Sequence, residues 1–118
     1  MGEKEYGRSE RVAEQIRKDL AWILDREMAD PRIGLVTISS VDLSKDLKSA
    51  KVYIAARDRE AGVQSARLLN RAAGFLRARL AARIKLRYVP NLRFANDEAL
   101  ERASRIDALL EDAKARRG

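Results

Sequence analysis

The chain has 118 residues, 46% of them hydrophobic and 36% charged, which suits one domain with a single core and is too short for two. It contains no cysteine and no histidine, and this excludes disulfides, the usual zinc sites and catalytic triads built on either residue. The formal net charge is +7, no apolar run reaches the roughly 18 residues of a membrane span, and the N-terminus lacks a signal peptide's apolar core. We therefore expect a cytoplasmic protein with no membrane segment, metal or cofactor.

The first third of the chain predicts one long helix. Residues 1–8 mix glycine and charged residues without a period, and we interpret them as a mobile N-terminal arm. Ser9 is the expected N-cap of a helix that runs to about Ala29, where Asp30-Pro31 ends it. Apolar residues at spacings of three and four form the stripe that should face the core: Val12, Ile16, Leu20, Ile23 and Leu24. Trp22 lies beside this stripe, and we expect it in the core or at its rim.

Three strands are predicted after this helix. Residues 34–41 and 49–56 are rich in β-branched side chains, and residues 42–48 between them have the composition of a hairpin turn. Residues 88–95 alternate apolar and polar side chains, with Pro90 close to the start, which suits an edge or first position of a strand.

The stretch 59–87 predicts two helices that meet near Gly74. At 100° per residue an apolar face contains Val63, Ala66, Leu69, Ala73, Leu76, Leu80 and Ile84, and the opposite face contains Arg67, Arg71, Arg77 and Lys85. Glycine inside a helix costs about 1 kcal/mol relative to alanine, so Gly74 suits a bend or the close approach of a phosphate backbone. Ala72, Ala73 and Gly74 are therefore the expected joint.

The positive charge of the chain is concentrated in the same stretch. Residues 61–96 contain eight of the 25 cations and no acid, which leaves 17 cations and all 18 acids for the rest of the chain. Such a block is typical of a polyanion partner, because Lys and Arg that neutralise phosphates release condensed counterions. An ordinary solvated arginine-rich helix face explains this window, taken alone, about equally well.

The predicted order is helix, strand, strand, helix, helix, strand, followed by a final helix and a frayed basic tail over residues 97–118. A three-stranded sheet covered by helices on one face is an α+β fold, and this order is that of the type II KH domain, a module that binds single-stranded RNA. We assign residues 9–96 to this KH-like domain. The GXXG loop of KH domains is absent, and Ala72-Ala73-Gly74 stands in its place.

Several separated motifs resemble the bacterial ribosome-binding factor A family. They are Asp30-Pro31-Arg32-Ile33-Gly34, residues 46–53, residues 69–77 around the Ala-Ala-Gly joint, residues 86–94, and the short runs 97–100 and 105–107. The resemblance covers about residues 8–112. It implies that the joint at Ala72 and Gly74 replaces GXXG and kinks the helix pair. It also implies binding to the free or immature small ribosomal subunit, near its ribosomal RNA, to promote late maturation and processing.

We therefore expect a monomeric, non-enzymatic RNA-binding assembly factor. Arg67, Arg71, Arg77 and Lys85 would contact phosphates beside the second strand, with Gly74 allowing close approach. Arg79 and Arg83 project to another side, for a second contact or for solubility. A protein-interaction adaptor that binds an acidic partner is the alternative. An enzyme acting on RNA would need carboxylates here, and Asp97-Glu98 is better explained as the first turn of the last helix.

Overall fold

The computed structural model describes residues 2–28, 30–33 and 35–99. The elements are α1 (Gly2–Arg26), β1 (Thr37–Leu43), β2 (Ser49–Ala55), α2 (Arg59–Arg71), α3 (Ala73–Arg83) and β3 (Asn91–Asn96). This confirms the predicted order from the first helix to the third strand. The predicted C-terminal helix and tail lie, from residue 100 onward, outside the described residues.

The three strands form one mixed sheet in the order β1-β2-β3. β1 and β2 are antiparallel, as the predicted hairpin requires, and β3 lies parallel to β2 at the edge. A β-bulge places Ser39 between the paired residues Ile38 and Ser40. The extra residue shifts the alternation, so that Val41 lies on the same face of β1 as Ile38 despite their odd spacing.

One face of the sheet carries the core. Ala50, Val52 and Ile54 of β2 are buried, whereas Lys51 is exposed and Tyr53 half-buried on the opposite face. The predicted apolar stripe of α1 and the apolar face of the central helices meet this surface, and the fully buried helical residues are Ile16, Leu20, Ile23, Leu69, Leu76 and Leu80. Among the described residues, the helices therefore cover one face of the sheet and leave the other open.

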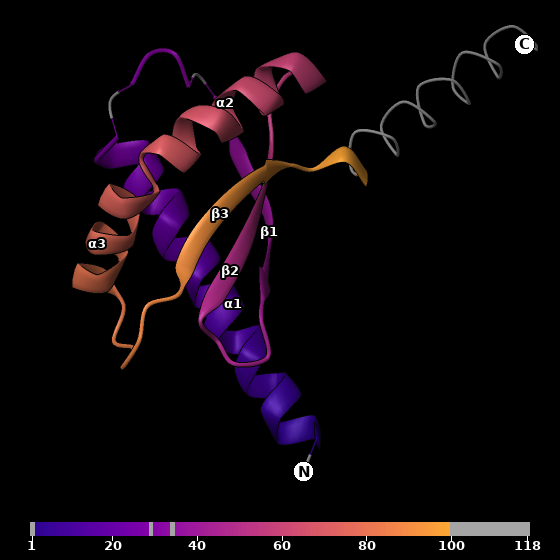
Figure 1. Cartoon of the computed structure of the whole chain (residues 1–118), viewed down its shortest axis with the longest axis vertical. Helices are drawn as coiled ribbons and strands as arrows, with labels where there is room; N and C mark the ends of the chain where they lie inside the picture. The colour runs from indigo at the N-terminus through magenta and orange to yellow at the C-terminus, as the bar shows by residue number, and fades with distance from the viewer. Residues whose placement is uncertain (1, 29, 34, 100–118) are drawn as a thin grey trace, which may run out of the picture.

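Each helix has a different neighbour in this layer. α1 packs on β1 and on α3, whereas α2 packs mainly on β3 (Figure 1). α3 packs on both α1 and β3, and in Figure 1 it lies to the left of both. Within the described residues, no helix is long and apolar enough to cross a membrane.

Several predicted boundaries are wrong. α1 begins at Gly2 rather than after Ser9, because residues 3–5, Glu-Lys-Glu, are good helix formers and no proline interrupts the following residues. The mobility that we expected for residues 1–8 stays a prediction. α3 ends at Arg83, not near residue 86, because Ile84 is already extended on the path to β3. Pro90 is confirmed next to the start of an edge strand.

Candidate nucleic-acid interface

The exposed side of α2 presents two arginines. Asp58 begins the helix, because its carboxylate accepts a hydrogen bond from the Ala61 amide at 2.8 Å. Leu69 is buried, and Arg67 and Arg71, four residues apart, are both exposed. Neither guanidinium forms an ion pair with an acid within the part of the chain that the structure describes. These two arginines can therefore meet an external anion without breaking an internal contact.

Asn70 fixes this end of α2 to the edge strand. Its side-chain Nδ2 donates to the Phe94 carbonyl at 2.9 Å, and its Oδ1 accepts from the Phe94 amide at 2.7 Å. The side-chain amide thus pairs with β3 as the backbone of another strand would. At the other end of α2, a Cβ atom on Gly62 would lie 2.0 Å from Oδ1 of Asn96, so the helix passes very close to β3 there.

The two central helices meet at Ala72. Its backbone has φ −93° and ψ 7°, outside regular helix geometry, and its amide is shared between the Leu68 and Leu69 carbonyls at 3.2 and 3.1 Å. Gly74 belongs to the first turn of α3, and its φ is not positive. A Cβ atom on Gly74 would meet nothing within 4 Å. The fold therefore does not need glycine at this position. The feature that glycine provides here is an open surface without a side chain.

Arg77 and Lys85 lie beyond the joint. The Arg77 Nε donates to the Val89 carbonyl at 3.0 Å, which ties α3 to the loop before β3 while the side chain stays exposed. Lys85 is exposed in that loop, two residues after the end of α3. It does not continue the helical face of Arg67 and Arg71, as the helical angle had suggested.

Arg79 and Arg83 hold α3 against α1. The Arg79 guanidinium donates to both carboxylate oxygens of Glu27, at 2.6 and 2.8 Å. The Arg83 guanidinium lies 3.7 Å from the centroid of the Trp22 ring, and its Nε is 3.6 Å from Oδ1 of Asp19. The hydrogen bond from Arg79, with help from the charges of Arg79 and Arg83, lowers the pKa of Glu27.

These contacts divide the six cations of the predicted site into a group that is available to a partner and a group that is engaged within the protein. Arg67, Arg71, Arg77 and Lys85 remain available to a partner, whereas the guanidinium groups of Arg79 and Arg83 are engaged with α1. The main strand beside α2 and α3 is β3, and the second strand, which we expected there, has a smaller contact with α2. The signal that sequence reasoning missed is at the end of α1, where Asp19 and Trp22 are followed by Glu27, one residue beyond the helix.

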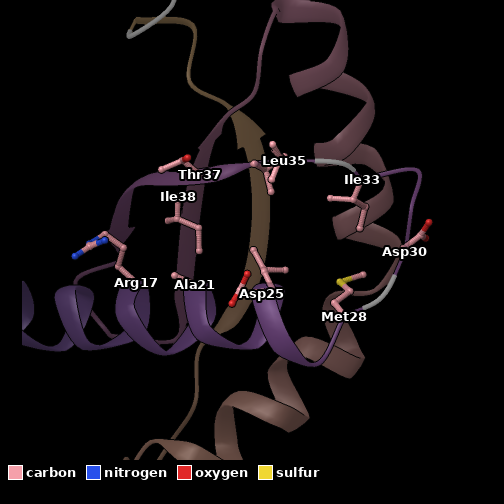
Figure 2. Close-up of a pocket in the computed structure, with 11 residues that line it drawn as sticks. Arg17, Ala21, Asp25, Met28, Asp30, Ile33, Leu35, Thr37 and Ile38 are labelled. Carbon is pink, nitrogen blue, oxygen red and sulfur yellow. The ribbon is translucent and has the colours of Figure 1, made fainter.

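A pocket between α1 and the start of β1 is a competing candidate site (Figure 2). It has a volume of about 380 Å³, and its walls are mostly apolar, with Ala21, Met28 and Ile38 among them. The carboxylate of Asp30 at its rim is bonded to Arg32 at 2.7 Å. Among the described residues, no three His, Cys, Asp or Glu side chains are grouped as metal ligands would be. The pocket therefore offers no constellation to which we can assign chemistry.

Comparison with known proteins points to one family. The model of a family described as ribosome-binding factor A matches residues 8–110. A protein of that name from a strain of Pseudomonas fluorescens is 45% identical over 115 residues, which cover 95% of this chain and 86% of the relative.

Solved structures give the same result. The crystal structure of ribosome-binding factor A from Thermus thermophilus is 35% identical, with a TM-score of 0.66, over 75% of this chain and 94% of that one. A homology model of the Thermus thermophilus factor, fitted into a cryo-electron microscopy map of its complex with 30S, is 38% identical. Its TM-score is 0.61, and the match covers 72% of this chain and 90% of that chain.

Proposed function

Because this chain belongs to the ribosome-binding factor A family, we propose that it binds the small ribosomal subunit and promotes the late maturation of its ribosomal RNA. The Thermus factor that was fitted into a 30S complex supports this choice of partner. We further propose that the protein acts by binding and catalyses no reaction.

The observation that carries the proposal is the pair of exposed arginines on α2. Arg67 and Arg71 lie on one side of the helix, near the open surface at Gly74, and have no acidic partner among the described residues. Arg77 and Lys85 extend the same positive charge toward the loop before β3. We define these four cations as the helix-pair surface. None of the four forms an ion pair with an acid among the described residues, and their contact with phosphates would release counterions from the RNA.

The helix-pair surface supports binding through the RNA backbone more than through bases. Only 5% of the residues are aromatic, so stacking supplies a small share of the contacts, and the positive charge supplies most of them. A factor of this kind promotes maturation when it binds an immature RNA conformation more tightly than the finished one, since a ligand shifts an equilibrium only by its difference in affinity. No chemical step is required of the protein.

Charge reversal on α2 tests the proposal. The double variant Arg67→Glu/Arg71→Glu should lose cosedimentation with small subunits and retain its melting temperature, because neither side chain has an ion pair to lose in the described structure. Arg26→Glu/Arg57→Glu is the matched control, with the same change of net charge at two exposed arginines away from the joint. Cells that carry only the α2 variant should accumulate precursor small-subunit RNA.

Two results would contradict this function. Undiminished cosedimentation of the α2 variant would show that the helix-pair surface does not bind the subunit. Retention of the partner after nuclease treatment would instead favour an adaptor that binds an acidic protein.

A further inference from the structure

The open face of the sheet carries two cations side by side. Lys51 on β2 and Arg93 on β3 are partners in the parallel register, and both are exposed. Like charges directly opposite each other on neighbouring strands are destabilising. Asp42 faces Lys51 from β1, yet the Lys51 ammonium lies over the Tyr53 ring, 5.3 Å from its centroid. Within the described residues neither cation forms an ion pair, so this face keeps a repulsion that an external anion would relieve.

Tyr53 gives the same face a surface for stacking. Its ring lies on the open side of β2, because Val52 and Ile54 on either side point into the core. A hollow of about 740 Å³ lies beside Tyr53 and Lys51 and is bounded by residues 95–99, and it reaches Val63 and Ala66 of α2. The hollow is large enough for an unstacked base.

The acids at the far end of this hollow already have partners. Asp97 accepts a hydrogen bond from the Ser39 hydroxyl at 2.6 Å, and Glu98 lies 3.2 Å from the guanidinium of Arg59. The two cations without an ion pair, Lys51 and Arg93, therefore lie closer to the start of β3 than these acids do. A bound phosphate backbone would lie there, with a base directed toward Tyr53.

The loop between α3 and β3 connects this face with the helix-pair surface. Arg87 is exposed in the loop, and Tyr88 is 75% exposed. The loop is held where it enters β3, by Arg77 on the Val89 carbonyl at 3.0 Å and by the Asn91 amide on the Lys48 carbonyl at 2.9 Å. Positive charge thus continues from the helix pair around the start of β3 to the open face.

We propose that the open face of the sheet is a second RNA site, where Lys51 and Arg93 contact phosphates of a single strand and Tyr53 stacks on one base. The ligand is single-stranded because bases inside a duplex cannot present a face to an aromatic ring. This inference rests on the proposed function, since it needs RNA as the partner. It adds a site on the face opposite to the helices, and it assigns stacking to one tyrosine.

The test measures binding of the full chain to a labelled, unstructured RNA of about ten nucleotides, a typical length for such a site. Lys51→Gln/Arg93→Gln should weaken binding about tenfold at low salt and reduce the salt slope of log K by about 1.4, the value for two lost phosphate contacts on a single strand. Arg26→Gln/Arg57→Gln removes the same net charge elsewhere and should cause a much smaller change. The sheet variant should be at least as stable as the wild type, because a like-charge repulsion is removed.

Tyr53 separates stacking from general charge. Tyr53→Phe should bind as the wild type does, whereas Tyr53→Ser should weaken binding of the single strand about tenfold, as loss of one stacked base does. Binding of a duplex of the same length should be equal for both variants. Equal affinities of Tyr53→Phe and Tyr53→Ser for the single strand would overturn the stacking role.

The remaining outcomes separate this inference from the proposed function. Wild-type affinity of Lys51→Gln/Arg93→Gln, together with weak binding of Arg67→Glu/Arg71→Glu, would overturn the second site and leave the proposed function intact. Wild-type affinity of both double variants for RNA and for subunits would overturn both. Loss of subunit binding by the sheet variant without loss of RNA affinity would overturn the second site, because the face would then contact a ribosomal protein.

Discussion

Two arginine pairs with the same spacing lie on consecutive helices and have opposite surroundings. Arg67 and Arg71 of α2 have no acidic partner among the described residues, whereas Arg79 and Arg83 of α3 contact Asp19 and Trp22 of α1 and Glu27 directly after it. The cause is packing, because α1 lies against α3 and α2 lies against β3 (Figure 1). The sequence of a helix therefore shows how many cations it carries. The element that packs against the helix decides which of these cations remain available to bind a partner.

The contact between α1 and α3 includes a nearly buried carboxylate. Asp19 is only 8% exposed, and its other partner is the side-chain amide of Gln15 at 3.0 Å. A buried carboxylate without a cation or hydrogen-bond donors is costly, so Arg83 stabilises the fold by staying where it is. We expect the α3 pair to act on stability and the α2 pair to act on binding.

Reversing the charges of Arg79 and Arg83 should have the largest effect on stability. If stability did not fall, the contrast between the α2 pair and the α3 pair would be refuted. In Arg79→Glu/Arg83→Glu, two new carboxylates would face Glu27 and Asp19, so repulsion would replace attraction between α1 and α3. We expect a clearly lower melting temperature by circular dichroism than for the wild type or for Arg67→Glu/Arg71→Glu.

A charge swap controls for the loss of arginine itself. Adding Glu27→Arg to Arg79→Glu restores an opposite-charge pair and should recover part of the melting temperature. Equal melting temperatures for the α2 and α3 double variants would show that the contacts with α1 do not stabilise the protein.

Substitution at the joint between the two pairs should have an intermediate effect. Gly74→Ala places a methyl group in open space at a helical position, so it should raise the free energy of unfolding by about 0.5–1 kcal/mol. Subunit affinity should fall at the same time, because the methyl group keeps the RNA backbone away from α3. Urea unfolding and cosedimentation measure the two effects.

Gly62→Ala is the matched glycine variant. Its Cβ atom would lie 2.0 Å from Oδ1 of Asn96 and would displace that side chain from its present position, so we expect lower stability there, in contrast with Gly74→Ala. If Gly74→Ala raised stability and left subunit affinity unchanged, the RNA backbone would not approach this turn.

Acid should weaken the contact between α1 and α3 by a smaller amount. Arg79 lowers the pKa of Glu27, so the unfolded chain takes up a proton on this residue at a higher pH than the folded protein does. The stabilisation is complete above the ordinary glutamate pKa of about 4.3 and is lost as pH falls through the folded pKa. Urea unfolding at pH values from 7 to 3 should show a shallower decline for Glu27→Gln than for the wild type.

Other acids titrate in the same range, and a second variant accounts for them. Hydrogen bonds from Arg17 and Arg32 lower the pKa of Glu14 and Asp30, and both residues remain in Glu27→Gln. Glu10→Gln removes an exposed carboxylate of α1 that has no ion pair in the described structure. A decline as shallow for Glu10→Gln as for Glu27→Gln would show that the Arg79 pair is not the cause.

Much of the fold could be predicted because apolar spacing reports local structure. The stripe through Ile16, Leu20 and Ile23 and the alternation through Val52 and Ile54 are both buried as expected. The start of α1 could not be predicted from Ser9, since a serine is compatible with a helix interior when helix formers precede it. Helix propensity and capping conflict there, and the sequence alone does not show which prevails.

The candidate site was predicted less completely. The cationic stretch and the joint near Gly74 follow from spacing, because both are local properties of the chain. The roles of Arg79 and Arg83 depend on how α1 packs, and their partners lie more than fifty residues away in the sequence. Asn70 was missed for the same reason, since nothing near residue 70 indicates a bond to the backbone of Phe94.

That bond has a consequence for how copies of this protein behave at high concentration. β3 is an edge strand, and edge strands can join those of other molecules and begin aggregation. The Asn70 amide already occupies both backbone groups of Phe94, so an incoming strand would first have to displace it. One side chain at the end of a helix thus blocks strand pairing at Phe94, in the middle of this edge.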